Sequence, residues 1–337
     1  MTMNRQWLLA SRPTGEPQVE NFRLASTPVP QPGEGEVLVH NHYLSLDPYM
    51  RGRMDESRSY AKPQELDKVM QGATAGVVLE SRAPGFAKGE HVVTALGWQE
   101  YGCLRPPVPQ ALQTLRKVDA TRVPLSVHLG CVGMPGVTAW YGINEIIAPG
   151  KGETVVVSAA SGAVGAVAGQ LARRAGARVV GVAGGAEKCA AVVDEFGFDA
   201  CVDYKAGRLV EDLAAATPDG VDGCYENVGG AVLDAVLARM NPFGRIAVCG
   251  LISGFNGVPM PIMNFRSVLV NRLRIQGFII SEQLQIWPRA LAELEALVAS
   301  GEMKYRESIA QGIEWAPQAF LGLLKGRNFG KQLVKLQ

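Results

Sequence analysis

The chain has 337 residues, a formal net charge of +1 and 47% hydrophobic residues. The length suggests roughly two domains, and the near-neutral charge argues against nucleic acid or an anionic membrane as a partner. No apolar stretch approaches the length of a membrane span, and the N-terminal segment has too short an apolar core for a signal peptide. The six cysteines form no C-x-x-C pair, so free, reduced thiols in a cytoplasmic protein are expected.

Residues 7–102 contain short β-like segments. Residues 35–43 alternate between apolar and polar side chains, as a strand with one buried face does. Shorter strand patterns follow at 76–80 and 91–95, and Pro-Gly and Lys-Gly turns separate them. This part of the chain predicts a small barrel rather than a parallel sheet.

From about residue 126, strand-like runs alternate with helical patterns. Strands are predicted at 154–157, 178–182, 200–203, 223–226, 245–249 and 274–280, and helices at 165–175, 187–196, 208–216 and 230–240. Six strands joined by crossover helices predict a doubly wound α/β sheet.

The C-terminal part leaves that sheet. A helix is predicted at about 285–300, and residues 303–337 return to a strand, a helix and a strand. We expect this tail to rejoin the N-terminal part. The predicted domains are therefore 1–127 together with 301–337, which is discontinuous, and 128–300.

A strand–turn–helix unit at mid-chain carries a nucleotide-binding pattern. The β-branched run 154–157 is followed by a turn with Gly162 and Gly165, and Ala160 stands where G-x-G-x-x-G has its first glycine. Gly162 lets the backbone approach a pyrophosphate, and Gly165 lets the helix pack closely on the strand. Such a turn can also serve packing alone, but a strand before it and a helix after it favour dinucleotide binding.

The end of the second strand favours NADP over NAD. An NAD site usually has an acidic residue there, roughly 20 residues after the glycines, that binds the ribose 2′-hydroxyl. This chain instead has Val182-Ala183-Gly184-Gly185 and then Lys188. A lone lysine is often only a solvated helix residue, but the absence of an acid makes Lys188 a candidate ligand of the 2′-phosphate.

Four motifs in order resemble one branch of the medium-chain dehydrogenase/reductases. They are SLDPYMRGRM at 45–54, AASGAVG at 159–165, YENVGG at 225–230 and RIQGF at 274–278. The branch is the zinc-independent, NADPH-dependent alkenal/one reductases, which include prostaglandin reductases and curcumin reductase. The resemblance covers essentially the whole chain. It implies a GroES-like β-rich barrel domain plus a doubly wound Rossmann domain, and a homodimer.

The resemblance also implies the cofactor residues. The pyrophosphate is expected at Gly162, Ala163, Val164 and Gly165, and the 2′-phosphate at Lys188 and Tyr204. Tyr204 could instead be an ordinary tyrosine at a strand end. The remaining expected contacts follow later strands or lie in the tail: Asn227, Cys249, Gly250, Leu251, Ile252, Ser253, Phe278, Ile279, Ile280 and Asn328. Met134 is expected on the nicotinamide side, next to the substrate.

The residues give no support for a catalytic zinc. Such an ion needs about three protein ligands and an open position. Where the zinc enzymes of the superfamily carry Gly-His-Glu, this chain reads QGATAG at 71–76. His40 and His42 share one face of a strand, but without a third ligand nearby they are better read as ordinary histidines.

Without a metal, reduction of a carbon–carbon double bond conjugated to a carbonyl is the easier chemistry. Hydride adds to the β-carbon, the carbonyl oxygen needs a hydrogen-bond donor, and the α-carbon needs a proton. The candidate catalytic residues are Tyr49 and Tyr60, both in a long loop region between strands. Arg51 and Arg53 are candidates for binding an anionic or carbonyl substrate, although such arginines often form salt bridges.

One departure from the family concerns the proton donor. Some relatives have a tyrosine before the R-I-Q-G-F strand, whereas residues 264–273 here contain none. Two alternatives to a reductase of small enones or enals stay open: a quinone reductase of the same superfamily, and an NADPH-binding sensor without turnover. The sequence does not identify the physiological substrate.

Overall fold

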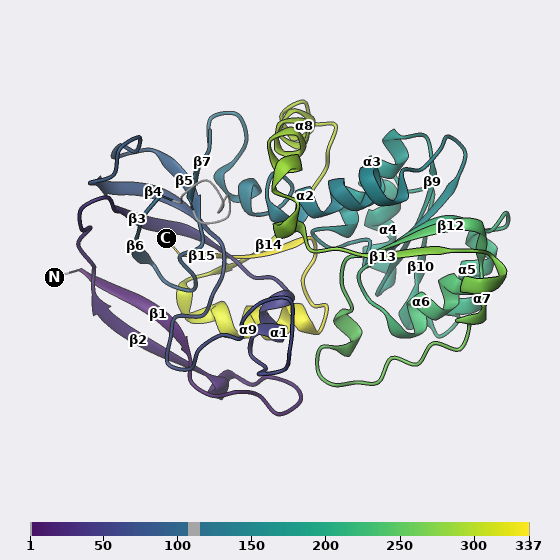
Figure 1. The fold of residues 1–337 in the computed structure, drawn as a ribbon, viewed down its shortest axis with the longest axis horizontal. Coiled ribbons are helices and arrows are strands. Elements are labelled where there is room, and N and C mark those ends of the chain that lie inside the picture. Colours follow the sequence, from purple (N-terminus) through teal and green to yellow (C-terminus); the bar gives the residue numbers. More distant parts are fainter. Residues whose placement is uncertain (1, 107–114, 337) are drawn as a thin grey trace. The chain divides into compact units, whose positions relative to one another are not determined.

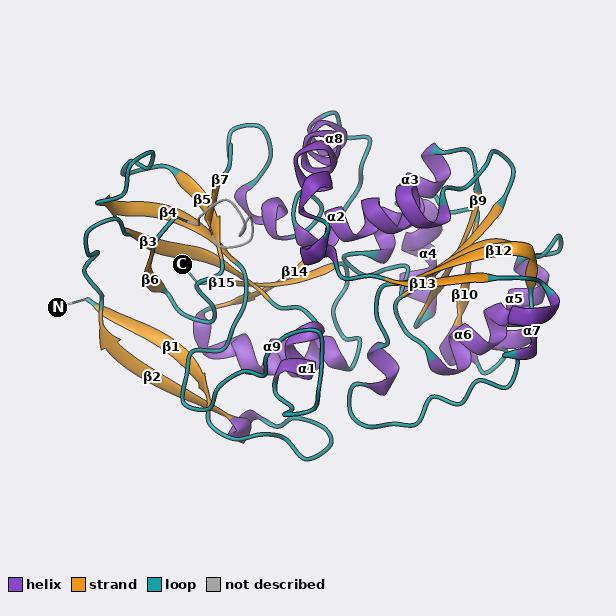
Figure 2. Cartoon of the chain, in the orientation of Figure 1, coloured by secondary structure: helices purple, strands orange, loops and turns teal. Residues whose placement is uncertain are grey.

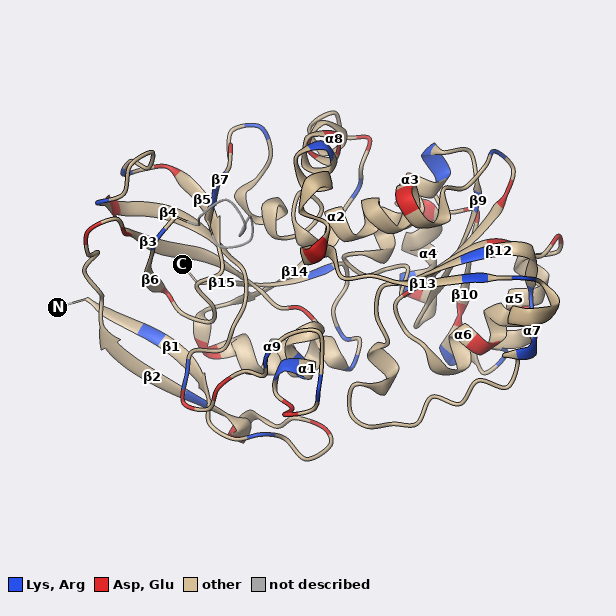
Figure 3. Cartoon of the chain, in the orientation of Figure 1, with Lys and Arg blue, Asp and Glu red and all other residues tan. Residues whose placement is uncertain are grey.

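The computed structural model describes residues 2–106 and 115–336. The chain divides into two compact units, residues 1–129 with 307–337, and residues 130–306. Figure 1 labels the elements of both, and each unit is described by itself. Lysine and arginine are interspersed with aspartate and glutamate along both units (Figure 3).

The described residues of the first unit form a seven-stranded sheet and a separate hairpin. The strands are β1 (Met3–Leu9), β2 (Phe22–Pro28), β3 (Val37–Ser45), β4 (Thr74–Ser81), β5 (His91–Thr94), β6 (Tyr101–Leu104), β7 (Leu115–Lys117), β14 (Glu307–Gln311) and β15 (Lys331–Lys335). The order is β14-β15-β3-β4-β5-β7, with β6 also paired to β3 and β1 paired to β2. Because β15 pairs with β3, the tail completes the N-terminal sheet.

Two helices of this unit frame its core. They are α1 (Tyr49–Arg53) and α9 (Ala316–Leu324). Phe320 of α9 packs edge-on against Trp98, with ring centroids 5.5 Å apart, and Trp98 stacks on Phe22 at 5.4 Å. Such aromatic pairs contribute about 0.5–1.5 kcal/mol each beyond the burial of their surface.

The second unit, which is described throughout, contains a six-stranded parallel sheet (Figure 2). Its strands are β8 (Thr154–Ser158), β9 (Arg178–Ala183), β10 (Ala200–Asp203), β11 (Val221–Glu226), β12 (Met240–Val248) and β13 (Arg274–Gly277). The spatial order is β10-β9-β8-β11-β12-β13. This is the 3-2-1-4-5-6 order of a Rossmann fold, in which ligands bind where the order reverses, here between β8 and β11.

Helices flank this sheet and join its strands. They are α2 (Met134–Tyr141), α3 (Gly165–Arg174), α4 (Ala186–Asp194), α5 (Leu209–Ala216), α6 (Gly230–Leu237), α7 (Arg266–Val270) and α8 (Trp287–Ala299). All residues of β8 are buried, which explains its unbroken β-branched run, because a central parallel strand is covered on both faces. The fold class predicted from the sequence is confirmed.

Several predicted element boundaries were wrong. The fifth strand begins at Met240 rather than residue 245. The sixth strand ends at Gly277 rather than residue 280, and Ile280 begins a short 3-10 helix. The fourth crossover helix ends at Leu237, because Met240 already pairs with Val221 as the first residue of β12. An apolar run shows which residues are buried but not where pairing starts or stops.

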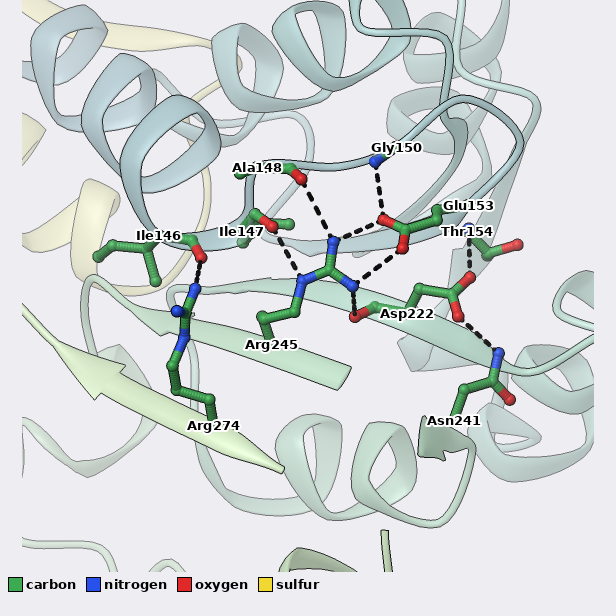
Figure 4. Close-up of polar contacts among 10 residues, drawn as sticks. All are labelled: Ile146, Ile147, Ala148, Gly150, Glu153, Thr154, Asp222, Asn241, Arg245 and Arg274. Atoms are coloured by element: carbon green, nitrogen blue, oxygen red, sulfur yellow. Dashed lines mark hydrogen bonds and ion pairs between the residues drawn. The ribbon is translucent and has the colours of Figure 1, made fainter. Parts of the chain in front are cut away.

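An arginine network closes the amino ends of the strands (Figure 4). Arg245 pairs with Glu153 at 2.5 Å and donates to the carbonyl of Ile147 at 2.9 Å. Arg274 donates to the carbonyl of Ile146. These carbonyls end a π-helical turn, Gly142–Ile147, that continues α2. Cations at a helix C-terminus satisfy carbonyls that lack helical partners, so the two arginines anchor this helix at the edge opposite the ligand edge.

Candidate active site

The glycine turn after β8 has the shape of a phosphate cradle. Ala159 has a positive φ of 49°, and the Gly162 amide donates to its carbonyl at 2.9 Å. A Cβ on Gly165 would lie 2.3 Å from that same carbonyl oxygen, so this position accepts only glycine. Helix α3 begins at Gly165 with no side-chain cap at Val164, its N-cap residue. The turn, which includes the half-buried Ala163, therefore fits a pyrophosphate bound by backbone N–H groups and the helix dipole.

A tyrosine ring occupies the space beside the end of β9. A Cβ on Gly184 would lie 2.8 Å from Cε1 of Tyr204 and 2.9 Å from Cε of Lys205. Asp203 fixes this arrangement by accepting from the amides of Gly185 at 2.8 Å and Lys205 at 2.9 Å. The tight contact at Gly184 leaves little space for the acidic side chain that would bind an unphosphorylated ribose.

Two lysines lie near one another at this end of β9. Burial, followed by the charge of Lys205, lowers the pKa of Lys188. Two ammonium groups near one another in a partly buried place are stabilised by a bound anion. Tyr204 is 46% exposed, so a large part of this residue is open to solvent. Sequence reasoning named Lys188 and Tyr204 but missed Lys205, although its position next to Tyr204 was a usable signal.

The carboxyl ends of β8 and β11 are joined by a buried carboxylate. Glu226, the last residue of β11, accepts from the Ser158 hydroxyl at 3.0 Å and from the amides of Val228 at 2.5 Å and Gly229 at 2.7 Å. Ser158 in turn accepts from the Asn227 amide at 2.7 Å, and the Asn227 side chain donates to the Ser158 carbonyl at 2.7 Å. Asn227 is thereby held at the point where the strand order reverses.

The loop after β12 lies directly beside Asn227. Cys249 donates its amide to the Glu226 carbonyl at 2.8 Å, and Ile252 donates to the Asn227 carbonyl at 3.2 Å. The Ser253 hydroxyl donates to the Val228 carbonyl at 2.6 Å. Residues Gly250 and Leu251 complete the same loop, which leads into a 3-10 turn at Ile252–Gly254. The structure thus brings together the predicted cofactor residues that follow β11 and β12.

Helix α2 packs against the same region. The Tyr225 hydroxyl donates to the Thr138 carbonyl at 2.9 Å, and the Thr138 hydroxyl donates to the carbonyl of Met134 at 2.6 Å.

Burial raises the pKa of the Cys249 thiol to about 11, which keeps this thiol protonated and poorly nucleophilic.

The residues after β13 approach the same helix. The Phe278 ring lies 5.2 Å from that of Tyr141, measured between centroids. Phe278 and Ile279 are half-buried, whereas Ile280 is buried and accepts from the Trp287 indole at 3.2 Å.

In the first unit, Arg53 connects the two candidate tyrosines. Its guanidinium carbon lies 4.3 Å from the ring centroid of Tyr60 and 5.9 Å from that of Tyr49. Tyr49 begins helix α1 rather than lying in a loop, whereas Tyr60 is 54% exposed in the loop that follows. Burial, followed by the charge of Asp47, raises the pKa of Tyr49. Its hydroxyl therefore stays protonated at neutral pH and is able to donate a hydrogen bond.

A buried ion pair supports the start of α1. Lys331 of β15 donates to Asp47 at 2.8 Å and to the Leu46 carbonyl at 2.7 Å, and both charged side chains are buried. Arg51 is also buried and donates to Asp55 at 2.7 Å and to the Gly15 carbonyl at 2.8 Å. These contacts give Arg51 a structural role, which leaves Arg53 as the stronger candidate for a substrate contact.

The predicted cofactor residue of the tail belongs to the first unit. Asn328 is half-buried in the loop before β15 and donates to the Gly330 carbonyl at 2.8 Å.

Within residues 2–106 and 115–336, no group of three or more His, Cys, Asp or Glu could hold a metal ion. No helix in those ranges is long and apolar enough to cross a membrane.

Two family profiles match the chain. Residues 5–111 match the N-terminal domain of oxidoreductase, and residues 163–296 match the family described as zinc-binding dehydrogenase. The chain is 46% identical to NADPH-dependent curcumin reductase of Escherichia coli, over 99% of this chain and 97% of that protein. It is 42% identical to the NADP(+)-dependent 2-alkenal reductase of Nicotiana tabacum, over 98% of this chain and 97% of the relative.

A solved structure agrees with these relatives. The crystal structure of CurA in complex with NADPH from Vibrio vulnificus superposes with a TM-score of 0.93 at 42% identity, covering 99% of each chain. The similarity spans both units, and the four motifs that first indicated the resemblance lie within it. The chain therefore belongs to the medium-chain dehydrogenase/reductases, in the branch of NADPH-dependent alkenal/one reductases.

Proposed function

We propose that this protein uses NADPH to reduce the carbon–carbon double bond of α,β-unsaturated ketones and aldehydes. The observation that carries the proposal is its full-length identity with a curcumin reductase and a 2-alkenal reductase. Their named substrates both contain a double bond conjugated to a carbonyl. The physiological substrate is a small molecule of this class.

NADPH is the cofactor, and when bound it supplies the hydride. The turn at 162–165 would hold its pyrophosphate, because Gly162 would let the backbone approach the ligand and Gly165 lets α3 begin directly against the Ala159 carbonyl. Lys188 and Tyr204 would hold the 2′-phosphate, with Lys205 as a third contact. Asn227 and the loop 249–253 would contact the nicotinamide half, as would residues 278–280 and Asn328.

The chain's own contribution to the reaction is to stabilise negative charge on the carbonyl oxygen. Tyr49 is suited to this, because its phenol hydroxyl is a hydrogen-bond donor and a donor placed at a developing oxyanion lowers the barrier. Arg53, stacked between Tyr49 and Tyr60, would hold both rings and add a positive field. Tyr60 is exposed and would contact the substrate or relay the proton for the α-carbon, alone or through water.

Other properties are proposed from the family resemblance. Residues 1–127 with 301–337 would form the catalytic domain, and 128–300 the cofactor domain. The protein would act as a cytoplasmic homodimer without zinc. Its partners would be the cofactor and the substrate, with neither nucleic acid nor membrane involved.

Steady-state kinetics with two oxidants test the proposal. We expect NADPH to be consumed rapidly with a short enone such as 3-nonen-2-one, and the product to be the saturated ketone. Consumption with benzoquinone should be slow. A faster rate with the quinone would favour a quinone reductase. Tight NADPH binding without turnover of any enone would favour a sensor.

A further inference from the structure

Glu226 is a buried carboxylate that the expected set of site residues does not include. Its side chain has no exposed surface, and no described cation contributes to its electrostatics. Burying a charge without a cation costs several kcal/mol unless hydrogen bonds replace the lost water. A leucine or valine here would fill a strand end without that cost, so the carboxylate calls for an explanation.

The hydrogen bonds around Glu226 favour its ionised form. Oε1 accepts from two backbone amides, those of Val228 and Gly229, and from the Ser158 hydroxyl. Burial is the largest influence and raises the pKa of the carboxyl overall, although these three donors oppose that shift. Hydrogen bonds to the charged form favour that form, so the donors offset part of the cost of burying the charge.

The position of Glu226 gives the charge a target. Glu226 ends β11 and Ser158 ends β8, and their hydrogen bond crosses the point where the strand order reverses. A dinucleotide binds across that point, outside the carboxyl ends of the strands. Asn227, the proposed nicotinamide contact, is the next residue and is held through Ser158.

Oxidised and reduced nicotinamide differ by one positive charge on the ring. A fixed negative charge beneath the crevice therefore stabilises the oxidised form more than the reduced form, and the low dielectric of a buried site strengthens the effect. Tighter binding of the oxidised form makes the bound reduced form a stronger hydride donor. Each tenfold change in the ratio of the two dissociation constants corresponds to about 30 mV for a two-electron couple.

We infer that Glu226 tunes the cofactor's hydride-donor strength, by holding Asn227 in place and by favouring the positively charged ring electrostatically. The inference rests on the proposed function, since it requires NADPH to bind at this crevice. The inference concerns the ratio of the affinities for NADP⁺ and NADPH. A general loss of structure or of binding would weaken both affinities without shifting their ratio in a defined direction.

The test is the dissociation constants of NADP⁺ and NADPH, measured by isothermal titration calorimetry at one pH and ionic strength. Glu226→Gln keeps the shape and an acceptor oxygen but removes the charge. We expect its ratio of Kd for NADP⁺ to Kd for NADPH to rise about tenfold, the change that corresponds to 1.4 kcal/mol. Glu153→Gln is the matched control, because it removes the same charge at the amino end of β8 and should leave the ratio unchanged.

A second variant covers the case in which Glu226→Gln does not fold. Glu226→Asp keeps the charge but shortens the reach to Val228 and Gly229, so both dissociation constants should rise together at a constant ratio. An unchanged ratio in Glu226→Gln, an equal change in Glu153→Gln, or a shifted ratio in Glu226→Asp would overturn the inference. Failure of the unmutated protein to bind NADPH would instead overturn the proposed function.

Discussion

Replacing Lys188 by alanine should weaken NADPH binding selectively. Lys188 is half-buried, and burial, followed by the charge of Lys205, lowers its pKa, so a second cation already lies near it. A hydrogen bond between a charged donor and a phosphate contributes about 1.5–3 kcal/mol. Loss of that bond corresponds to a roughly 10- to 150-fold higher Kd for NADPH. NADH lacks the 2′-phosphate, so its Kd should stay within about twofold.

Titration calorimetry with both dinucleotides measures this difference directly. Lys151→Ala is the matched control, since Lys151 is exposed in the turn before β8 and should change neither dissociation constant. Equal weakening of NADPH and NADH by Lys188→Ala would show that Lys188 supports the fold or the shared adenosine rather than the phosphate. An unchanged Kd for NADPH would refute the assignment of the pocket.

Three further variants test the site and the framework that supports it. Tyr49→Phe should lower kcat on an enone about 100-fold while leaving the Kd for NADPH unchanged; a kcat within threefold of the parent would remove Tyr49 from the catalytic role. Arg245→Met loses the pair with Glu153 and the bonds to helix-end carbonyls, so the free energy of unfolding should fall by about 3 kcal/mol in denaturant titrations, and an unchanged midpoint would contradict the structural role. Burial lowers the pKa of His128 to about 4, below the roughly 6.5 of an unfolded chain. The unfolded state therefore takes up the proton first, and this stability is present above pH 6.5 and lost as the pH falls towards 4. His128→Leu should accordingly lose less stability over that interval, by up to about 3 kcal/mol at pH 4, and an equal acid loss in both proteins would refute the assignment.

The sequence predicted the second unit well, for a physical reason. Parallel strands buried on both faces require long apolar runs, and the helices between them carry alanine-rich patterns. The four predicted crossover helices and all six predicted strands correspond to observed elements, with the largest boundary errors at Leu237, Met240 and Gly277. Helix α2 was harder to recognise, because Pro135 and Gly136 stand in its first turn and both residue types are also typical of turns.

The candidate site was predictable only in part. Gly162, Gly165 and Lys188 follow from local spacing, because a strand–turn–helix unit places them near one another. The contact of Tyr204 with Gly184 and the cluster of Tyr49, Arg53 and Tyr60 depend on tertiary packing.

Glu226 shows the same limit more clearly. Its donors come from β8 and from the turn after β11, so no pattern within one segment indicates that a carboxylate is buried there. Residues that act through long-range hydrogen bonds are therefore the ones that sequence reasoning misses.

The most direct test of the proposed reaction follows the hydride itself. NADPH deuterated at C4 of the nicotinamide, on either face in separate reactions, is used to reduce 3-nonen-2-one, and the product is examined by NMR. We predict a saturated ketone that carries deuterium on the carbon β to the carbonyl, from one labelled face only. Deuterium on the carbinol carbon of an allylic alcohol would contradict the account, because the hydride would then have been added to the carbonyl.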